Sequence, residues 1–277
     1  MNKKILLCIV AFIASSISFA ESPVVPVETA QLKSIGNVRV SMQRMLRSVD
    51  GRYFLDLYAG IWNPHGVLTD TAENKSIAFK GNQKGDFINL KSVSVDSMDQ
   101  AIAKYELSGK LDANTGLMAA ELSSSDPKER AAISFEPAFK AADKPVIVFK
   151  YYGAEGADQP YGKALKRLDI VNKTNNTLMQ SLTGFTAFAG SIGFLDINFD
   201  GYYDVVLADT SENRKIEDKR FIYWMYNPKT KQFQRSRQLE NITGFPALHG
   251  DKQQIDFGNG QLYRVTNGLL NKIQELN

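Results

Sequence analysis

Short β segments separated by turn signals recur along most of this 277-residue chain. Residues 53–58 alternate apolar and polar side chains, and residues 146–152 form the most apolar of these segments. Turns built from Gly, Asn, Asp and Pro follow at roughly 30-residue intervals. Because such segments with little helical periodicity are typical of propellers and sandwiches, we expect an all-β fold.

A β-propeller is the favoured architecture, because short and numerous hairpins must stack on neighbours to bury both faces. The alternative is a pair of β domains that meet near residues 141–143. Helix is predicted only for residues 97–104 and 266–276, the latter from its leucine and isoleucine spacing.

The first 20 residues have the features of a secretory signal peptide. Lys3 and Lys4 precede an apolar run over residues 5–13, and small residues flank Phe19 at the expected cleavage point. The apolar run is too short to span a bilayer as a stable helix. We therefore expect a soluble protein in the periplasm, with an extended linker over residues 21–35 and a folded domain over residues 36–277.

Cysteine and charge exclude several classes of function. The single cysteine, Cys8, lies inside the signal peptide, so the mature chain has neither disulfides nor thiolate metal sites. The chain has 33 basic and 30 acidic residues, and removal of Lys3 and Lys4 leaves 31 against 30. This balance favours neither nucleic acid nor an anionic membrane surface as a partner.

The stretch from residue 196 to 204 has the spacing of a calcium-binding loop. Oxygen-bearing side chains occupy its positions 1, 3, 5 and 9, which are Asp196, Asn198, Asp200 and Asp204. Gly201 at position 6 permits a sharp turn, and Tyr202 at position 7 would offer its backbone carbonyl. An EF-hand would carry Glu at position 12, but that residue is Leu207.

The flanks of this loop indicate strands rather than the helices of an EF-hand. Residues 191–195 and 204–207 are rich in β-favouring side chains. We therefore predict a strand–loop–strand hairpin that binds Ca²⁺, closed by Asp204 in place of the missing Glu. The alternative is a metal-free Asx-rich turn. Three carboxylates in one short loop repel one another without a cation, which favours the metal.

Two segments, residues 194–204 and residues 223–233, resemble FG-GAP/VCBS-like periplasmic proteins of Gram-negative bacteria. The resemblance covers roughly residues 145–260 and is strongest over residues 191–233. Members of that group include lysozyme inhibitors and immunity proteins against secreted lysozyme-like effectors. The resemblance implies a propeller of about five blades with Ca²⁺ in the loop, and a peptidoglycan-cleaving enzyme as partner.

Inhibitory contacts are harder to assign. Several lysozyme-inhibitor families carry a Ser-Gly-x-x-Tyr loop, and this chain has Ser108-Gly109-Lys110-Leu111 followed by Asp112 in the Tyr position. The Gly- and Tyr-rich stretch 151–163 can present aromatic anchors from a rigid scaffold. We therefore take Tyr161 and Lys163 as candidate partner contacts, with an ordinary connecting loop as the alternative.

Catalytic motifs are weak. Residues 189–193 approach a nucleophile elbow but have Ala in place of the first Gly, and a strand is expected where such an elbow needs a helix. Two histidines, His65 and His249, make a zinc site improbable without cysteine. We expect a non-enzymatic inhibitor that occludes the cleft of a lysozyme-like peptidoglycan hydrolase. The alternative is a calcium-stabilised glycan- or envelope-binding module without a toxin partner.

Overall fold

The computed structural model describes residues 32–60, 62–93, 104–124, 126, 130–266 and 268–273. The predicted signal peptide lies outside them, as do residues 21–31 of the predicted linker and residues 97–103 of the first predicted helix. Within the described chain, no helix is long and apolar enough to cross a membrane. Strands dominate these residues, and the expectation of an all-β fold is confirmed.

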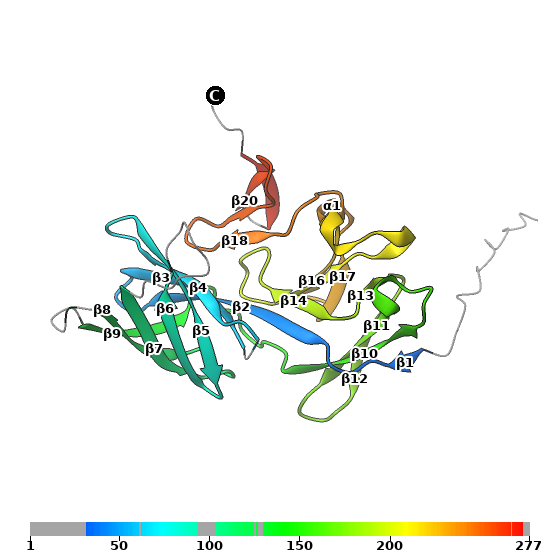
Figure 1. The fold of residues 1–277 in the computed structure, drawn as a ribbon, viewed down its shortest axis with the longest axis horizontal. Coiled ribbons are helices and arrows are strands. Elements are labelled where there is room, and N and C mark those ends of the chain that lie inside the picture. Colours follow the sequence, from blue (N-terminus) through cyan, green and yellow to red (C-terminus); the bar gives the residue numbers. More distant parts are fainter. Residues whose placement is uncertain are drawn as a thin grey trace, which may run out of the picture. The chain divides into compact units, whose positions relative to one another are not determined.

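Eight antiparallel strands within residues 39–137 close into a barrel (Figure 1). They are β2 (Arg39–Ser48), β3 (Tyr53–Ala59), β4 (His65–Asp70), β5 (Lys75–Lys84), β6 (Phe87–Ser92), β7 (Tyr105–Leu111), β8 (Met118–Ser124) and β9 (Arg130–Pro137). Each strand pairs with the next, and β9 returns to β2, with Pro137 opposite Leu46 and Phe135 opposite Ser48. Every second side chain points inward, so leucines such as Leu55 and Leu57 fill the interior.

Strand β2 joins the barrel to a further run of strands in the same sheet. Its second half closes the barrel, while its first half runs parallel to β14 (Ser191–Leu195), with Arg39 opposite Ser191 and Met42 opposite Phe194. The blue ribbon of β2 can be followed from the barrel to β14 in Figure 1. The sheet then continues antiparallel through β15 (Asp204–Ala208), β16 (Phe221–Asn227) and β17 (Gln232–Arg235).

Two further sheets complete the described chain. The first contains β1 (Lys33–Ser34), β10 (Ile147–Glu155), β11 (Lys163–Asn172), β12 (Leu178–Leu182) and β13 (Ala187–Phe188). The second contains β18 (Ala247–His249), β19 (Gln254–Asp256), β20 (Leu262–Thr266) and β21 (Leu269–Lys272). The helical pieces are η1 (Pro160–Gly162), η2 (Ser211–Asn213), η3 (Ile216–Asp218) and α1 (Arg237–Glu240).

The sheet of β14 to β17 is buried on both faces. Val205 and Leu207 of β15 join a core shared with Leu168 and Ile170 of β11. The intervening Val206 points the other way, into a core built with β18 to β20. This alternation explains why residues 204–207 read as a continuous apolar run rather than as a half-polar strand.

The prediction of a propeller of about five blades does not describe residues 39–137. There the strands close on themselves, so each hairpin buries its inner face without stacking on a blade. The alternative boundary near residues 141–143 falls in the connection between β9 and β10. The end of the predicted linker forms β1, whose Lys33 and Ser34 pair with β10.

The helix predicted for residues 266–276 is wrong over the residues that the structure describes. β20 ends at Thr266, the chain turns at Gly268 with a φ of +74°, and β21 returns antiparallel with Leu269 opposite Thr266. Of the apolar residues that suggested a helix, Leu270 packs against the core beneath this hairpin, while Leu269 is exposed.

Candidate functional site

The predicted calcium loop connects β14 to β15. Leu195 and Asp204 are paired across the two antiparallel strands, so the loop closes a hairpin as expected. Phe199 at its tip has a left-handed backbone with a φ of +57°. Its buried ring packs against Phe139 with ring centroids 5.3 Å apart, which fixes the tip against the β9–β10 connection.

Asp196 organises the turn of the loop. One carboxylate oxygen accepts a hydrogen bond from the Asp200 N–H at 3.0 Å, and the other accepts from the Gly201 N–H at 2.9 Å. Gly201 has a φ of +87°, and a Cβ there would lie 2.9 Å from the Ala141 nitrogen. Only glycine therefore combines this backbone with the close approach of the neighbouring segment.

Asp204 is an anchor between strands. Its Oδ2 accepts from the Ile197 N–H at 2.9 Å, and its Oδ1 accepts from the Tyr226 N–H of β16 at 2.8 Å. The side chain is buried, and this burial raises the pKa of its carboxyl well above its usual range. Both oxygens thus already have backbone donors, whatever else they bind.

Asn198 and Asp200 leave one oxygen unsatisfied. The Asn198 amide donates to Asp200 Oδ2 at 2.8 Å, and the Tyr202 N–H donates to Asp200 Oδ1 at 2.8 Å. Asn198 Oδ1 is buried and has no hydrogen-bond partner in the structure. A buried carbonyl oxygen without a donor is what a bound cation would satisfy.

The donor set fits Ca²⁺ in part. Asp196, Asn198 and Asp200 all place side-chain oxygens in this loop. The pKa of Asp196 is raised to about 7, mainly by burial and then by the charge of Asp200. Ca²⁺ takes six to eight oxygens, so the Tyr202 carbonyl, Asp204 and water would have to complete the shell. Within the described residues, no three His, Cys, Asp or Glu side chains form a ready metal cluster.

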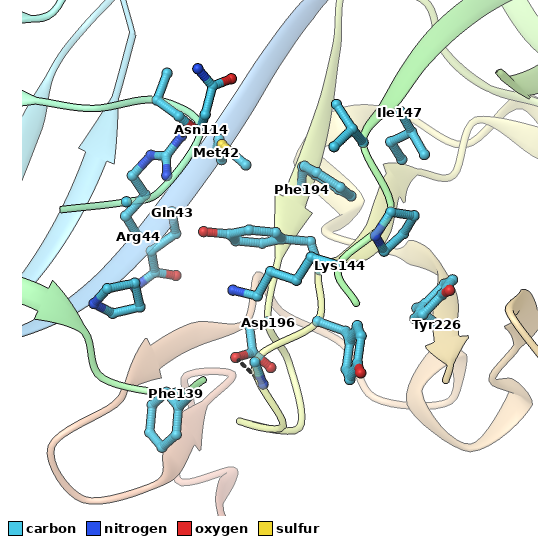
Figure 2. Close-up of a pocket in the computed structure, with 18 of the residues that line it drawn as sticks. Met42, Gln43, Arg44, Asn114, Phe139, Lys144, Ile147, Phe194, Asp196 and Tyr226 are labelled. Carbon is cyan, nitrogen blue, oxygen red and sulfur yellow. Dashed lines mark hydrogen bonds between the residues drawn. The ribbon is translucent and has the colours of Figure 1, made fainter. Parts of the chain in front are cut away.

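The outer side of the loop forms a wall of a pocket of about 390 Å³ (Figure 2). Other walls come from β2, from the β7–β8 turn and from the β9–β10 connection. Polar and charged lining side chains include Gln43, Arg44, Asn114, Lys144 and Asp196, and aromatic ones include Phe139, Phe194, Tyr203 and Tyr226. Figure 2 shows Lys144 extending toward Asp196.

Sequence reasoning missed this pocket. Its walls come from segments near residues 42, 114, 144 and 202, which only the tertiary fold brings together. Arg44 is one of several polar residues in β2, so nothing in the sequence singles it out. Tyr202, predicted as a backbone ligand, also donates its hydroxyl to the Ala142 carbonyl and thereby ties the loop to the pocket's edge.

The predicted contact residues Tyr161 and Lys163 lie away from this pocket, at the β10–β11 hairpin. The Tyr161 ring is 48% exposed and packs edge-on against Phe188. Its hydroxyl donates to Glu217 at 3.1 Å and accepts from the Ile216 N–H at 3.0 Å. Tyr161 is therefore partly committed to holding η3.

A second hollow, of about 420 Å³, lies on the barrel at β5, β6 and β7. It brings the Ser108-Gly109-Lys110 sequence beside Lys84 and Phe87. Phe87 is 66% exposed, and it is paired with Lys110 across the two strands.

Comparisons with known proteins identify no relative: no family model and no curated protein matches the chain.

Proposed function

We propose that this protein is an exported, calcium-binding inhibitor of a lysozyme-like peptidoglycan hydrolase, which acts by occluding the substrate cleft and performs no chemistry itself. The observation that supports this proposal is the barrel surface around Phe87. An exposed aromatic ring there stands between two lysines, Lys84 and Lys110, with Ser108 as a hydroxyl donor.

This surface suits the chemistry of such a cleft. Glycoside hydrolases of this kind carry a pair of carboxylic side chains at the bottom of a groove that binds extended glycan. Lysine ammonium groups and a hydroxyl would bind those carboxylates, and an exposed aromatic ring supplies the apolar anchor typical of interface hot spots. Acidic residues lie nearby as well: Asp86 is in the β5–β6 turn, Glu121 is paired with Ser108, and Glu106 accepts a hydrogen bond from the Asn89 amide.

The Tyr161/Lys163 surface is the weaker candidate for the same role. The Tyr161 hydroxyl already hydrogen-bonds Glu217 and the Ile216 N–H, and its ring packs against Phe188, so less of this side chain is free to contact a partner. The Phe87 surface is therefore the first to test, and Tyr161/Lys163 is the comparison.

The test measures whether the protein inhibits a panel of lysozyme-like hydrolases. Hydrolase activity is monitored by the clearing of a peptidoglycan suspension. We expect the Phe87→Ala/Lys110→Ala variant to inhibit at least tenfold less than wild type at unchanged melting temperature, with a smaller effect of Tyr161→Ala/Lys163→Ala. Full inhibition by the first variant would reject this surface. If the wild-type protein inhibits no hydrolase, or turns over peptidoglycan in a manner lost in Ser191→Ala, the function itself is wrong.

A further inference from the structure

The pocket beside the loop contains a buried guanidinium without an anionic partner. Arg44 is 8% exposed and donates one hydrogen bond, from Nη2 to the Ala113 carbonyl at 2.9 Å. Its Nε is buried and has no acceptor. Among the ion pairs of the described residues, none involves Arg44.

A second cation enters the same pocket from the β9–β10 connection. The Lys144 ammonium lies 5.4 Å from the centroid of the Tyr203 ring and forms no ion pair within the described chain. Burial lowers the pKa of Lys144, and the neighbouring Arg44 lowers it further, against an opposite effect of Asp196. Unlike Arg44, Lys144 remains exposed to solvent.

The charges of the lining do not balance. Arg44, Lys144 and the exposed Lys173 are the cations among the described lining residues, and Asp196 is the single carboxylate. Both oxygens of that carboxylate accept backbone N–H groups inside the loop. A buried charge is ordinarily paired with an opposite charge. Arg44 has no such partner among the described residues, so the lining is cationic overall.

Aromatic side chains form the rest of the pocket and are held in place by their neighbours. Phe194 packs edge-on against Phe149, with centroids 5.2 Å apart, and lies 4.9 Å from Tyr203. Tyr226 packs against Phe233 at 5.1 Å. Fixed apolar walls with a few converging polar groups, in a volume of about 390 Å³, are typical of small-molecule sites.

We propose that this pocket binds a small organic anion, a carboxylate or phosphate carried on a flat apolar body. The anionic group would lie between Arg44 and Lys144, and the body would pack against the aromatic wall that includes Phe194. The guanidinium provides directional N–H donors and the ammonium a point charge, a pairing suited to both kinds of oxyanion. This site is separate from the Phe87 surface and does not depend on a hydrolase partner.

The test uses three matched probes: phenylacetate, phenyl phosphate and the neutral phenylacetamide. Binding to the purified protein is followed by calorimetry and by chemical-shift changes, in buffer free of multivalent anions. We expect at least one of the two anions to bind at least tenfold more tightly than phenylacetamide. Binding of phenyl phosphate alone supports the proposal and narrows the class to phosphates.

Two variants and one control locate the binding. Lys144→Gln decides the question, because Lys144 lies in a connection and its replacement leaves every strand intact. It should weaken anion binding at least tenfold, as should Arg44→Gln, whereas Lys229→Gln in the exposed β16–β17 turn should change nothing. Unchanged anion binding in Lys144→Gln, equal affinity for phenylacetamide, or no binding of either anion would overturn the proposal.

Discussion

The backbone N–H of Tyr226 donates a hydrogen bond to the Asp204 carboxylate at 2.8 Å, which ties the predicted calcium loop to a strand that begins 17 residues after Asp204. The other oxygen of Asp204 binds the Ile197 N–H within the loop. One buried side chain therefore holds three consecutive segments of the chain together. This role was not visible in the loop spacing, which assigned Asp204 only to the cation.

Asp204→Ala should lower the free energy of unfolding by about 3 kcal/mol, with calcium or with chelator present. Two buried N–H groups lose their acceptor, and each buried donor left without a partner costs roughly 1–3 kcal/mol. Urea denaturation in both buffers measures the effect, and Asp204→Asn, which keeps one acceptor oxygen, should be milder. A loss of stability seen only in calcium would show that Asp204 acts as a ligand and not as an anchor.

Calcium should stabilise the protein through the loop. At ten times the dissociation constant, a ligand that binds only the folded state adds about 1.4 kcal/mol. Melting curves with calcium and with chelator should separate for wild type and coincide for Asp196→Asn. Asp112→Asn is the control, because Asp112 forms a similar turn through the Asn114 and Thr115 N–H groups but has no converging carboxylates in its turn. Coincident curves for metal-free wild type would contradict the calcium assignment.

Gly201→Ala should lower the free energy of unfolding by more than the strain of a left-handed backbone alone explains. The added Cβ would meet the Ala141 nitrogen at 2.9 Å, so we expect a loss of about 2–4 kcal/mol. Gly258→Ala is the matched control, because Gly258 has a similar φ of +81° with nothing within 4 Å. The control should lose only about 1 kcal/mol. Equal losses in thermal or urea denaturation would mean that the contact with Ala141 is unimportant.

Asp56 should make stability fall as pH rises. Burial, followed by the charge of Asp251, raises its pKa from 3.8 to about 7, against a hydrogen bond from the Gln43 amide at 3.3 Å. Between pH 4 and 7 the folded state then retains a proton that the unfolded chain has lost. The contribution of Asp56 to the free energy of unfolding is therefore complete below pH 4 and is lost as the pH rises to about 7.

The comparison of wild type with Asp56→Asn isolates this effect. Because Asp56 is only partly buried, we expect the difference in unfolding free energy to change by roughly 1–3 kcal/mol across that range. Exposed Asp86→Asn serves as the control. A difference that stays constant from pH 4 to pH 7 would show that Asp56 titrates normally.

Local pairings were predictable from sequence because turn chemistry acts over a few residues. The hairpins at 105–122, 168–182, 191–207 and 221–234 all form where alternation and Asn, Asp or Gly turns placed them. The turn over residues 196–204 belongs to this class as a hairpin, since its spacing is local, while its calcium binding stays a prediction. The prediction of a helix at 266–276 was wrong because the apolar spacing of short strands can resemble that of a short helix.

Barrel closure was not predictable, because it depends on pairings between distant residues. Leu46 pairs with Pro137 and Arg39 with Ser191, and neither pairing leaves a trace in the periodicity of either strand. The pocket has the same origin, because Arg44 and Lys144 converge only after β2 and β9 have paired. Such sites follow from topology, which alternation in a single sequence does not determine.

The place of β2 in both the barrel and the run of strands beyond it sets the order in which this chain can fold. One edge of β2 pairs with the next strand, β3, but its partners on the other edge, β9 and β14, follow about one hundred and one hundred and fifty residues later. Such high contact order predicts slow folding, and that second edge is open to wrong pairing in the meantime. Because β2 is shared, we expect the barrel and strands β14 to β17 to unfold in a single cooperative transition.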